Sequence, residues 1–172
     1  MAYQFRGLQP RRSPAGFTLI ETMTVLLMVG IMAAIGVPSL LGFLAQAKIN
    51  SAFSRLDGLL KLTQREAVKK SKTCTFSLPN NDTKDSVISS TCSVTGSETL
   101  DDVIIKYNRV TSKKVSFSYR GHTSSTRTIV VYSNDTNYKR CLVISNGIGM
   151  MRKGKYTGSL TNIVAEDCET SI

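Results

Sequence analysis

The sequence predicts an α+β protein, in which a long, partly transmembrane N-terminal helix packs on a C-terminal antiparallel β-sheet domain. Three observations predict this class. An uncharged apolar stretch runs from Thr22 to Ala47, an amphipathic helical pattern follows, and a segment rich in Ser, Thr, Val, Ile and Tyr begins at Thr73. The 172 residues, 41% of them hydrophobic, suit one domain with an appendage and exclude a disordered chain.

The apolar stretch is long enough to cross a membrane, because a hydrocarbon core needs about 20 residues of helix. Arg6, Arg11 and Arg12 precede it, and residues 1–16 contain no acid. Basic flanks favour the cytoplasmic side, so we expect the rest of the chain to be exported. We therefore assign residues 17–47 to the transmembrane half of the helix, with a plain signal anchor as the simpler alternative.

Residues 48–72 form the predicted amphipathic half of the same helix. Their apolar positions recur with a period of 3.6 residues, which is typical of a helix half-buried on a globular domain. Gly58 is a weak point, since glycine costs about 1 kcal/mol relative to alanine within a helix. The positions expected to be buried are Ile49, Ala52, Phe53, Leu56, Leu59, Leu60, Thr63 and Ala67.

Residues 73–172 form the predicted β-rich globular domain. Turn signals separate seven candidate strands, and the strongest is Asn146-Gly147, a pair that favours a two-residue type I′ hairpin. We expect antiparallel sheets that pack on the second half of the helix. The candidate strands are 73–78, 86–94, 103–107, 114–120, 126–132, 140–145 and 148–152.

The junction Gly16-Phe17-Thr18-Leu19-Ile20-Glu21, after a basic leader and before an uncharged helix, resembles the processing motif of type IV pilins and type II secretion pseudopilins. The resemblance implies that a prepilin peptidase cleaves the leader, residues 1–16, after Gly16 and methylates the new amine of Phe17. It also implies that Glu21 pairs with the Phe17 amine of a neighbouring subunit during assembly. The physical chemistry agrees, since a buried carboxylate needs a cation.

Two residues are expected to interrupt the helix. Pro38 lacks an N–H donor and should kink or loosen the turn before it. Gly30 and Pro38 match positions between which, in the pilin family, the helix can melt on assembly.

The four cysteines lie on the side predicted to be exported, where disulfides persist. Three connectivities are possible. We favour Cys74–Cys92, which closes a local loop, and Cys141–Cys168, which ties the C-terminal tail to the last hairpin as in many pilin-like proteins. The absence of CxxC spacing disfavours zinc, and we expect no cofactor.

The C-terminal part resembles the GspH/FimT family of minor pilins and pseudopilins. The resemblance rests on residues 141–145, the Asn-Gly turn, residues 148–153 and the late Cys168. Some FimT proteins bind DNA through a Gly-Arg-x-Arg motif. Gly149 and Arg152 match that motif here, but Met150 stands in place of its first arginine.

A basic patch surrounds this motif. We expect Arg140, Arg152, Lys153 and Lys155 to gather across the predicted hairpin, with Arg140 close to Arg152, and to contact DNA phosphates. Phosphate contacts alone would give affinity without sequence specificity. The competing interpretation is a solvated basic face with only a structural role.

These observations predict a structural subunit, a minor pilin that helps to initiate or cap a type IV pilus, with DNA uptake as an additional role. The alternative is a GspH-like minor pseudopilin of a type II secretion system. An enzyme is not expected, because His122 lies in a turn and Ser124 and Ser125 have no candidate base. The expected partners are other pilins, the prepilin peptidase, the bacterial inner membrane and, in the additional role, DNA. The globular domain is expected in the periplasm or in an extracellular fibre.

Overall fold

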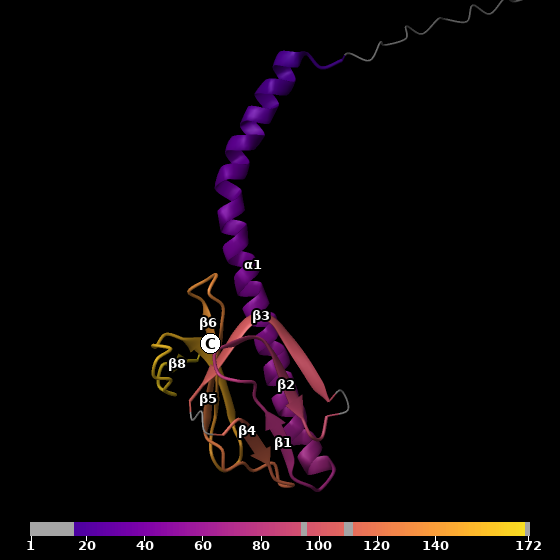
Figure 1. Ribbon diagram of the computed structural model, residues 1–172, viewed down its shortest axis with the longest axis vertical. Helices are drawn as coiled ribbons and strands as arrows, with labels where there is room; N and C mark the ends of the chain where they lie inside the picture. The colour runs from indigo at the N-terminus through magenta and orange to yellow at the C-terminus, as the bar shows by residue number, and fades with distance from the viewer. Residues whose placement is uncertain (1–15, 94–95, 109–111, 171–172) are drawn as a thin grey trace, which may run out of the picture. The chain divides into compact units, whose positions relative to one another are not determined.

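The computed structural model describes residues 16–93, 96–108 and 112–170, and within them the side chains of 35–39 are not described (Figure 1). Apart from Gly16, the predicted leader lies outside the described residues. The chain divides into two compact units, Met1–Ser39 and Leu40–Ile172. Each unit is considered by itself.

One helix, α1 (Leu19–Lys69), belongs to both units. It includes Gly30 and Pro38 without interruption, so the break predicted at these positions is absent from the single chain. Proline removes only one backbone donor, and the hydrogen bonds of the adjoining turns can hold the helix through such a position. Melting of this segment on assembly stays a prediction.

The part of α1 in the second unit buries one face. Ile49, Leu56 and Leu60 are fully buried, and Phe53 is 3% exposed. All eight positions that the helical period predicted are buried, because Ala52, Leu59, Thr63 and Ala67 complete the same stripe. The amphipathic interpretation is therefore confirmed.

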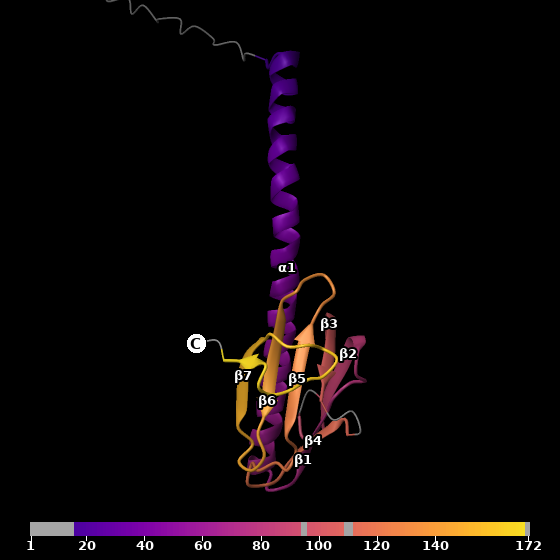
Figure 2. The ribbon, with the colours of Figure 1, turned by 90° about the vertical axis from the view of Figure 1, so that its left-hand side faces the viewer.

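The second unit contains one eight-stranded sheet in the order β4-β1-β2-β3-β5-β6-β7-β8, and every pair of neighbouring strands is antiparallel. Figure 2 shows β5, β6 and β7 side by side in front of α1. The α+β prediction is confirmed. The strands are β1 (Cys74–Ser77), β2 (Thr83–Ser90), β3 (Ser97–Tyr107), β4 (Lys114–Phe117), β5 (Arg127–Tyr132), β6 (Lys139–Ile144), β7 (Met151–Tyr156) and β8 (Cys168–Glu169).

Each of the seven predicted strands has a counterpart, but β8 was missed. The predicted hairpin around Asn146-Gly147 forms between β6 and β7, but its predicted two-residue turn is wrong. β6 and β7 end their ladder at Ile144 opposite Met151, so the connection covers 145–150. Gly147 instead forms an isolated bridge with Thr123 of another loop, through Gly147 N–H to Thr123 O at 2.9 Å and the reverse bond at 2.8 Å. A long-range contact thus overrides the local turn preference.

The sheet separates two apolar layers. The larger lies between α1 and one face of the sheet and includes Phe76, Phe117 and Leu142. The smaller lies on the opposite face and joins Val143 and Tyr156 to the C-terminal segment. Alternating side chains along β6 serve both layers, as the pleat of a strand requires.

Two disulfides fasten the ends of the sheet domain. Cys74 bonds to Cys92 with the Cα atoms 5.6 Å apart, and Cys141 bonds to Cys168 with the Cα atoms 5.8 Å apart. This is the connectivity favoured from the sequence. The second bridge holds the C-terminal segment against β6, where the smaller apolar layer lies.

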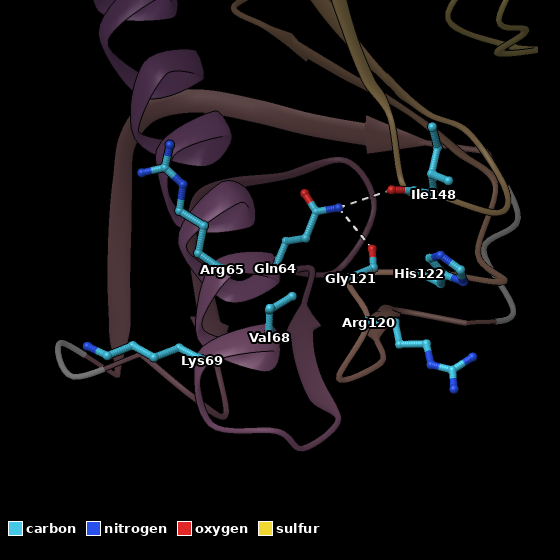
Figure 3. A pocket seen from close by; sticks show the side chains of 8 residues that line it. All are labelled: Gln64, Arg65, Val68, Lys69, Arg120, Gly121, His122 and Ile148. Carbon is cyan, nitrogen blue, oxygen red and sulfur yellow. Dashed lines mark hydrogen bonds between the residues drawn. The ribbon is translucent and has the colours of Figure 1, made fainter.

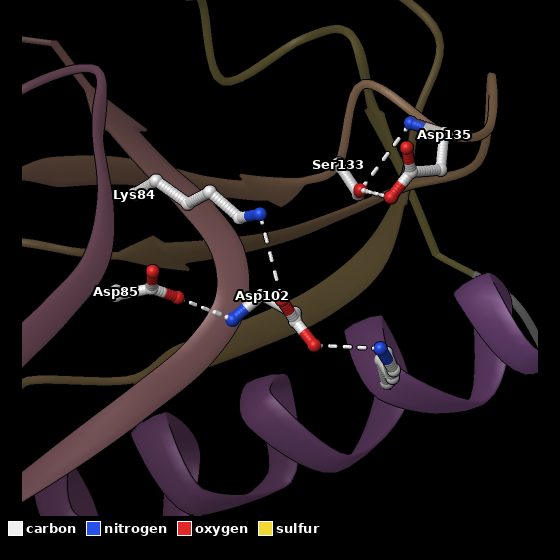
Figure 4. Close-up of polar contacts among 6 residues, drawn as sticks. Lys84, Asp85, Asp102, Ser133 and Asp135 are labelled. Carbon is white, nitrogen blue, oxygen red and sulfur yellow. Dashed lines mark hydrogen bonds and ion pairs between the residues drawn. The ribbon is translucent and has the colours of Figure 1, made fainter.

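An ion-pair cluster fixes α1 to the long hairpin of β2 and β3 (Figure 4). Lys48 Nζ lies 2.6 Å from Asp102 Oδ2, and Lys84 Nζ lies 3.4 Å from Asp102 Oδ1. Asp85 Oδ1 accepts a hydrogen bond from the Asp102 N–H at 2.6 Å, beside a bulge between Lys84 and Ser86. The hydrogen bond and charge of Lys48 hold the pKa of the Asp102 carboxyl below its usual value.

Candidate functional site

The predicted processing junction lies immediately before α1. Phe17 is 80% exposed and precedes the helix, so the peptide bond after Gly16 belongs to an irregular segment. Thr18 caps the helix, because its Oγ1 accepts the Glu21 N–H at 3.3 Å. Thr18 and Glu21 occupy the spacing of a capping box, and an acid in the first turn also complements the helix dipole.

The first unit leaves the helix surface uncovered in the single chain. The large apolar side chains that the structure describes in this unit are all more than half exposed, including Leu19, Met23, Leu26 and Met32. An apolar helix without a polar face is stable only when other apolar material covers it. Among the described residues, no helix is both long enough and apolar enough to span a membrane. The predicted transmembrane segment stays a prediction.

The carboxylate of Glu21 forms no ion pair or hydrogen bond with any other residue that the structure describes. The hydroxyls beside it are already satisfied, since Thr22 Oγ1 donates to Leu19 O at 2.8 Å and Thr24 Oγ1 donates to Glu21 O at 2.9 Å. A groove of about 330 Å³ lies beside Glu21, with Phe17 and Val25 among its lining residues. The site thus presents an acid without a partner on an apolar surface.

The predicted basic patch is divided between the two faces of the sheet. β6 and β7 pair Arg140 with Lys155, Leu142 with Lys153 and Val143 with Arg152. Arg140, Lys153 and Lys155 therefore lie on the face toward α1, and Arg152 lies on the opposite face. The predicted approach of Arg140 to Arg152 is wrong, because Arg152 pairs with Val143, whose side chain points to the opposite face of the sheet from that of Arg140.

Three of the four cations are engaged within the chain. The Arg140 guanidinium lies 4.8 Å from the centroid of the Phe53 ring and donates to Tyr138 Oη at 3.3 Å. Lys153 Nζ lies 3.2 Å from Asp57 Oδ2, whose side chain is 12% exposed. Arg152 Nη2 donates to Ala165 O at 2.7 Å. These contacts join α1 and the C-terminal segment to the sheet.

Lys155 differs from the other three cations. It is exposed, and its side chain has no partner among the described residues. The DNA contact predicted for Arg140, Arg152, Lys153 and Lys155 stays a prediction, and the geometry gives the first three a structural role.

Residues 11–37 match a family described as the prokaryotic N-terminal methylation motif. A fimbrial protein of Moraxella nonliquefaciens is 48% identical over 44 residues, which are 26% of this chain and 29% of that protein. The chain is type IV pilin-like. The match spans less than a third of the length of the fimbrial protein.

The fold of the pilin-like chain is also found in solved structures. Two crystal forms of the type IV minor pilin FimU of Pseudomonas aeruginosa strain PAO1 match it. The first has a TM-score of 0.51 at 17% identity and covers 66% of this chain and 94% of that chain. The second has a TM-score of 0.52 at 16% identity and covers 70% and 95%. At this identity the likeness shows the pilin fold alone.

Two residues that shape these sites were not predicted from the sequence. Thr18 was missed as the helix cap, although the Thr-x-x-Glu spacing signals it. Gln64 was missed as a link between two loops, with hydrogen bonds to Gly121 O at 2.9 Å and Ile148 O at 3.2 Å. No local pattern signals this contact, because its partners lie far away in the sequence.

Proposed function

We propose that the chain is a minor pilin, a structural subunit that is cleaved after Gly16, methylated on Phe17 and built into a type IV pilus. The observation that carries the proposal is Glu21, a carboxylate without a partner among the described residues on an exposed apolar helix. Cleavage would create a cation four positions earlier in the chain. Intermolecular pairing between that amine and Glu21 would neutralise both charges as apolar helices cover one another.

The two parts of the chain would then have separate roles. Residues 17–47 would be held in the inner membrane before assembly and against neighbouring helices afterwards. The unit that contains the sheet would lie outside the cytoplasm, and its two disulfides suit such an oxidising compartment. Pilins and the prepilin peptidase would be the partners, and no catalytic step is assigned to this chain.

The experiment compares Glu21→Gln with wild type in the cells that produce the protein. Mass spectrometry of the mature N-terminus is expected to show methylated Phe17 in both forms. Incorporation into sheared fibres is expected to fall at least about tenfold for the variant, since an uncompensated charge in an apolar contact costs several kcal/mol. Thr24→Val is the matched control, because it changes a neighbouring polar side chain without removing a charge. Processing at another position, or normal incorporation of Glu21→Gln, would refute the proposal.

A minor pseudopilin of a type II secretion system is the alternative, and a deletion strain separates the two. Loss of surface fibres with normal protein secretion supports the minor pilin, whereas loss of secretion with normal fibres supports the pseudopilin. Abundance in sheared fibres, relative to the other pilins, tests the minor role.

DNA uptake is not required by this proposal, since three of the four predicted cations have partners within the chain. A gel shift with a short DNA duplex at low salt tests the additional role. If Lys155 supplies DNA affinity, Lys155→Glu should weaken the shift, which should also fall steeply as salt rises.

A further inference from the structure

A groove of about 480 Å³ lies where the last turns of α1 meet two loops of the sheet domain (Figure 3). One loop, 118–126, joins β4 to β5, and the other, 145–150, joins β6 to β7. The residues that line it come from the helix and from both loops. We name this surface the polar-end groove, defined by Gln64, Arg65, Val68, Lys69, Arg120 and Ile148.

The groove is preorganised by close contacts at its base. The Gln64 side-chain amide donates to Gly121 O and Ile148 O, so it holds both loops to α1. Gly149 has a positive φ of 68°, and a Cβ atom there would lie 2.9 Å from Gln64 Nε2. Gly121 also has a positive φ, of 77°. A surface that is already fixed loses little conformational entropy when a partner binds.

Positive charge surrounds the groove without compensation. Arg65, Lys69 and Arg120 form no ion pair with any residue that the structure describes, and the lining contains no acid. In Figure 3 their side chains extend outward from the groove and not toward one another. The nearest acid in sequence, Glu66, is paired with Lys70 at 3.0 Å. The groove therefore complements a negatively charged partner.

Apolar surface lies directly beside these cations. Val68 is 50% exposed, Ile148 is 62% exposed, and the adjacent Met150 is also 62% exposed. Protein interfaces combine an apolar centre with a polar rim, which is the arrangement found here. A site for single-stranded nucleic acid would instead follow the phosphate backbone with a track of cations and free aromatic rings. No phenylalanine, tyrosine or tryptophan ring lines the groove among the described residues. Tyr119 is 51% exposed but is not part of the lining, and the Arg120 guanidinium lies 5.2 Å from its ring centroid.

We propose that the polar-end groove binds an acidic segment of a partner protein, with carboxylates on both sides of an apolar side chain. The carboxylates would pair with Lys69 and Arg120, and the apolar side chain would cover Val68 and Ile148. This contact uses none of the residues of the processing junction, so it stands or falls independently of the assembly role proposed for Glu21.

The test uses the mature full chain in detergent and a fluorescent peptide, EELEE, with QQLQQ as the uncharged probe. Fluorescence anisotropy at low salt is expected to show binding of EELEE and not of QQLQQ. The double variant Lys69→Glu/Arg120→Glu should lower the affinity at least about tenfold, because it reverses both charges at the groove. Lys114→Glu/Lys155→Glu is the matched control, since it changes the net charge equally elsewhere, and should stay within about twofold of wild type.

A second pair of measurements addresses the apolar part and the fold. Ile148→Ser should weaken EELEE but leave EEGEE nearly unchanged, because only the first peptide offers an apolar side chain. If Lys69→Glu/Arg120→Glu does not give the wild-type circular dichroism spectrum, Lys69→Gln/Arg120→Gln is used in its place.

Four outcomes would overturn the proposal. The first is no binding of EELEE by wild type, and the second is an equal loss of affinity in the groove and control double variants. The third is displacement of EELEE by a short DNA duplex at a lower concentration than the unlabelled peptide requires. The fourth is cross-linking of two copies of the chain through this groove. The third would assign the groove to nucleic acid, and the fourth would assign it to self-association.

Discussion

Two glycine-to-alanine changes should move the stability of the chain in opposite directions. Gly58 is a solvent-exposed residue in the middle of α1, and a Cβ atom added there would have no atom within 4 Å apart from its immediate helix neighbours. Alanine gains about 1 kcal/mol over glycine in such a position, so Gly58→Ala should raise the Tm by about 3–5 °C for a domain of this size. The gain comes chiefly from the unfolded chain, which has fewer conformations to lose.

Gly149→Ala makes the same chemical change at a position where the backbone conformation and the neighbouring atoms disfavour a Cβ atom. The positive φ of Gly149 alone costs an alanine about 1–2 kcal/mol. The new Cβ atom would also lie 2.9 Å from Gln64 Nε2 and 3.0 Å from Gly121 O, so crowding adds to the cost. The Tm should fall by at least about 4 °C.

The assay is thermal unfolding of the mature full chain in detergent under oxidising conditions, followed by circular dichroism. Wild type and both variants are measured together, so the ordering of the three Tm values is the result. A fall for Gly58→Ala, or a rise for Gly149→Ala, would refute the reasoning, since both expectations follow from backbone conformation and free space.

Three further predictions concern the disulfides and the charges. Replacing Cys74 and Cys92 together by serine should lower the free energy of unfolding by about 3 kcal/mol, because the bridge closes an 18-residue separation, and urea unfolding measures the loss. The lowered pKa of Asp102 should make stability fall as the pH drops below about 4 and through the folded pKa, and urea titrations across this range should be flatter for Asp102→Asn. Burial and a hydrogen bond to Asp82 raise the pKa of Tyr132 to about 12, so absorbance at alkaline pH should show a late-titrating phenol that Tyr132→Phe removes.

Patterns that repeat along the chain allowed much of the fold to be predicted. A period of 3.6 residues identified the buried stripe that runs from Ile49 to Ala67, since one face of a helix meets one core. The seven predicted strands correspond to β1–β7, although their ends shift by several residues. β8 was not predictable in this way, because a strand of two residues carries no alternation and is held by its partners.

The basic patch shows why proximity along the chain is a weak guide to a surface. Asn146-Gly147 has a strong local preference for a tight turn, but its contact with Thr123 opens a longer loop. Arg152 lies on the other face of the sheet from Arg140. A two-residue turn would have placed it on that face too, opposite Cys141, because neighbouring residues of a strand face opposite ways. The predicted processing junction does not depend on strand pairing, because Gly16, Phe17 and Glu21 are neighbours in the sequence itself.

The two edge strands are among the shortest strands of the sheet. β4 has four residues and β8 has two, and they stand at opposite ends of the strand order. Little open backbone is therefore left for another sheet to extend. In the proposed fibre, where similar domains would stand close together for long periods, such short edges would guard against β-aggregation between subunits. Contacts between subunits would then be made by helices and loops. Such contacts depend on side chains and therefore distinguish one partner from another.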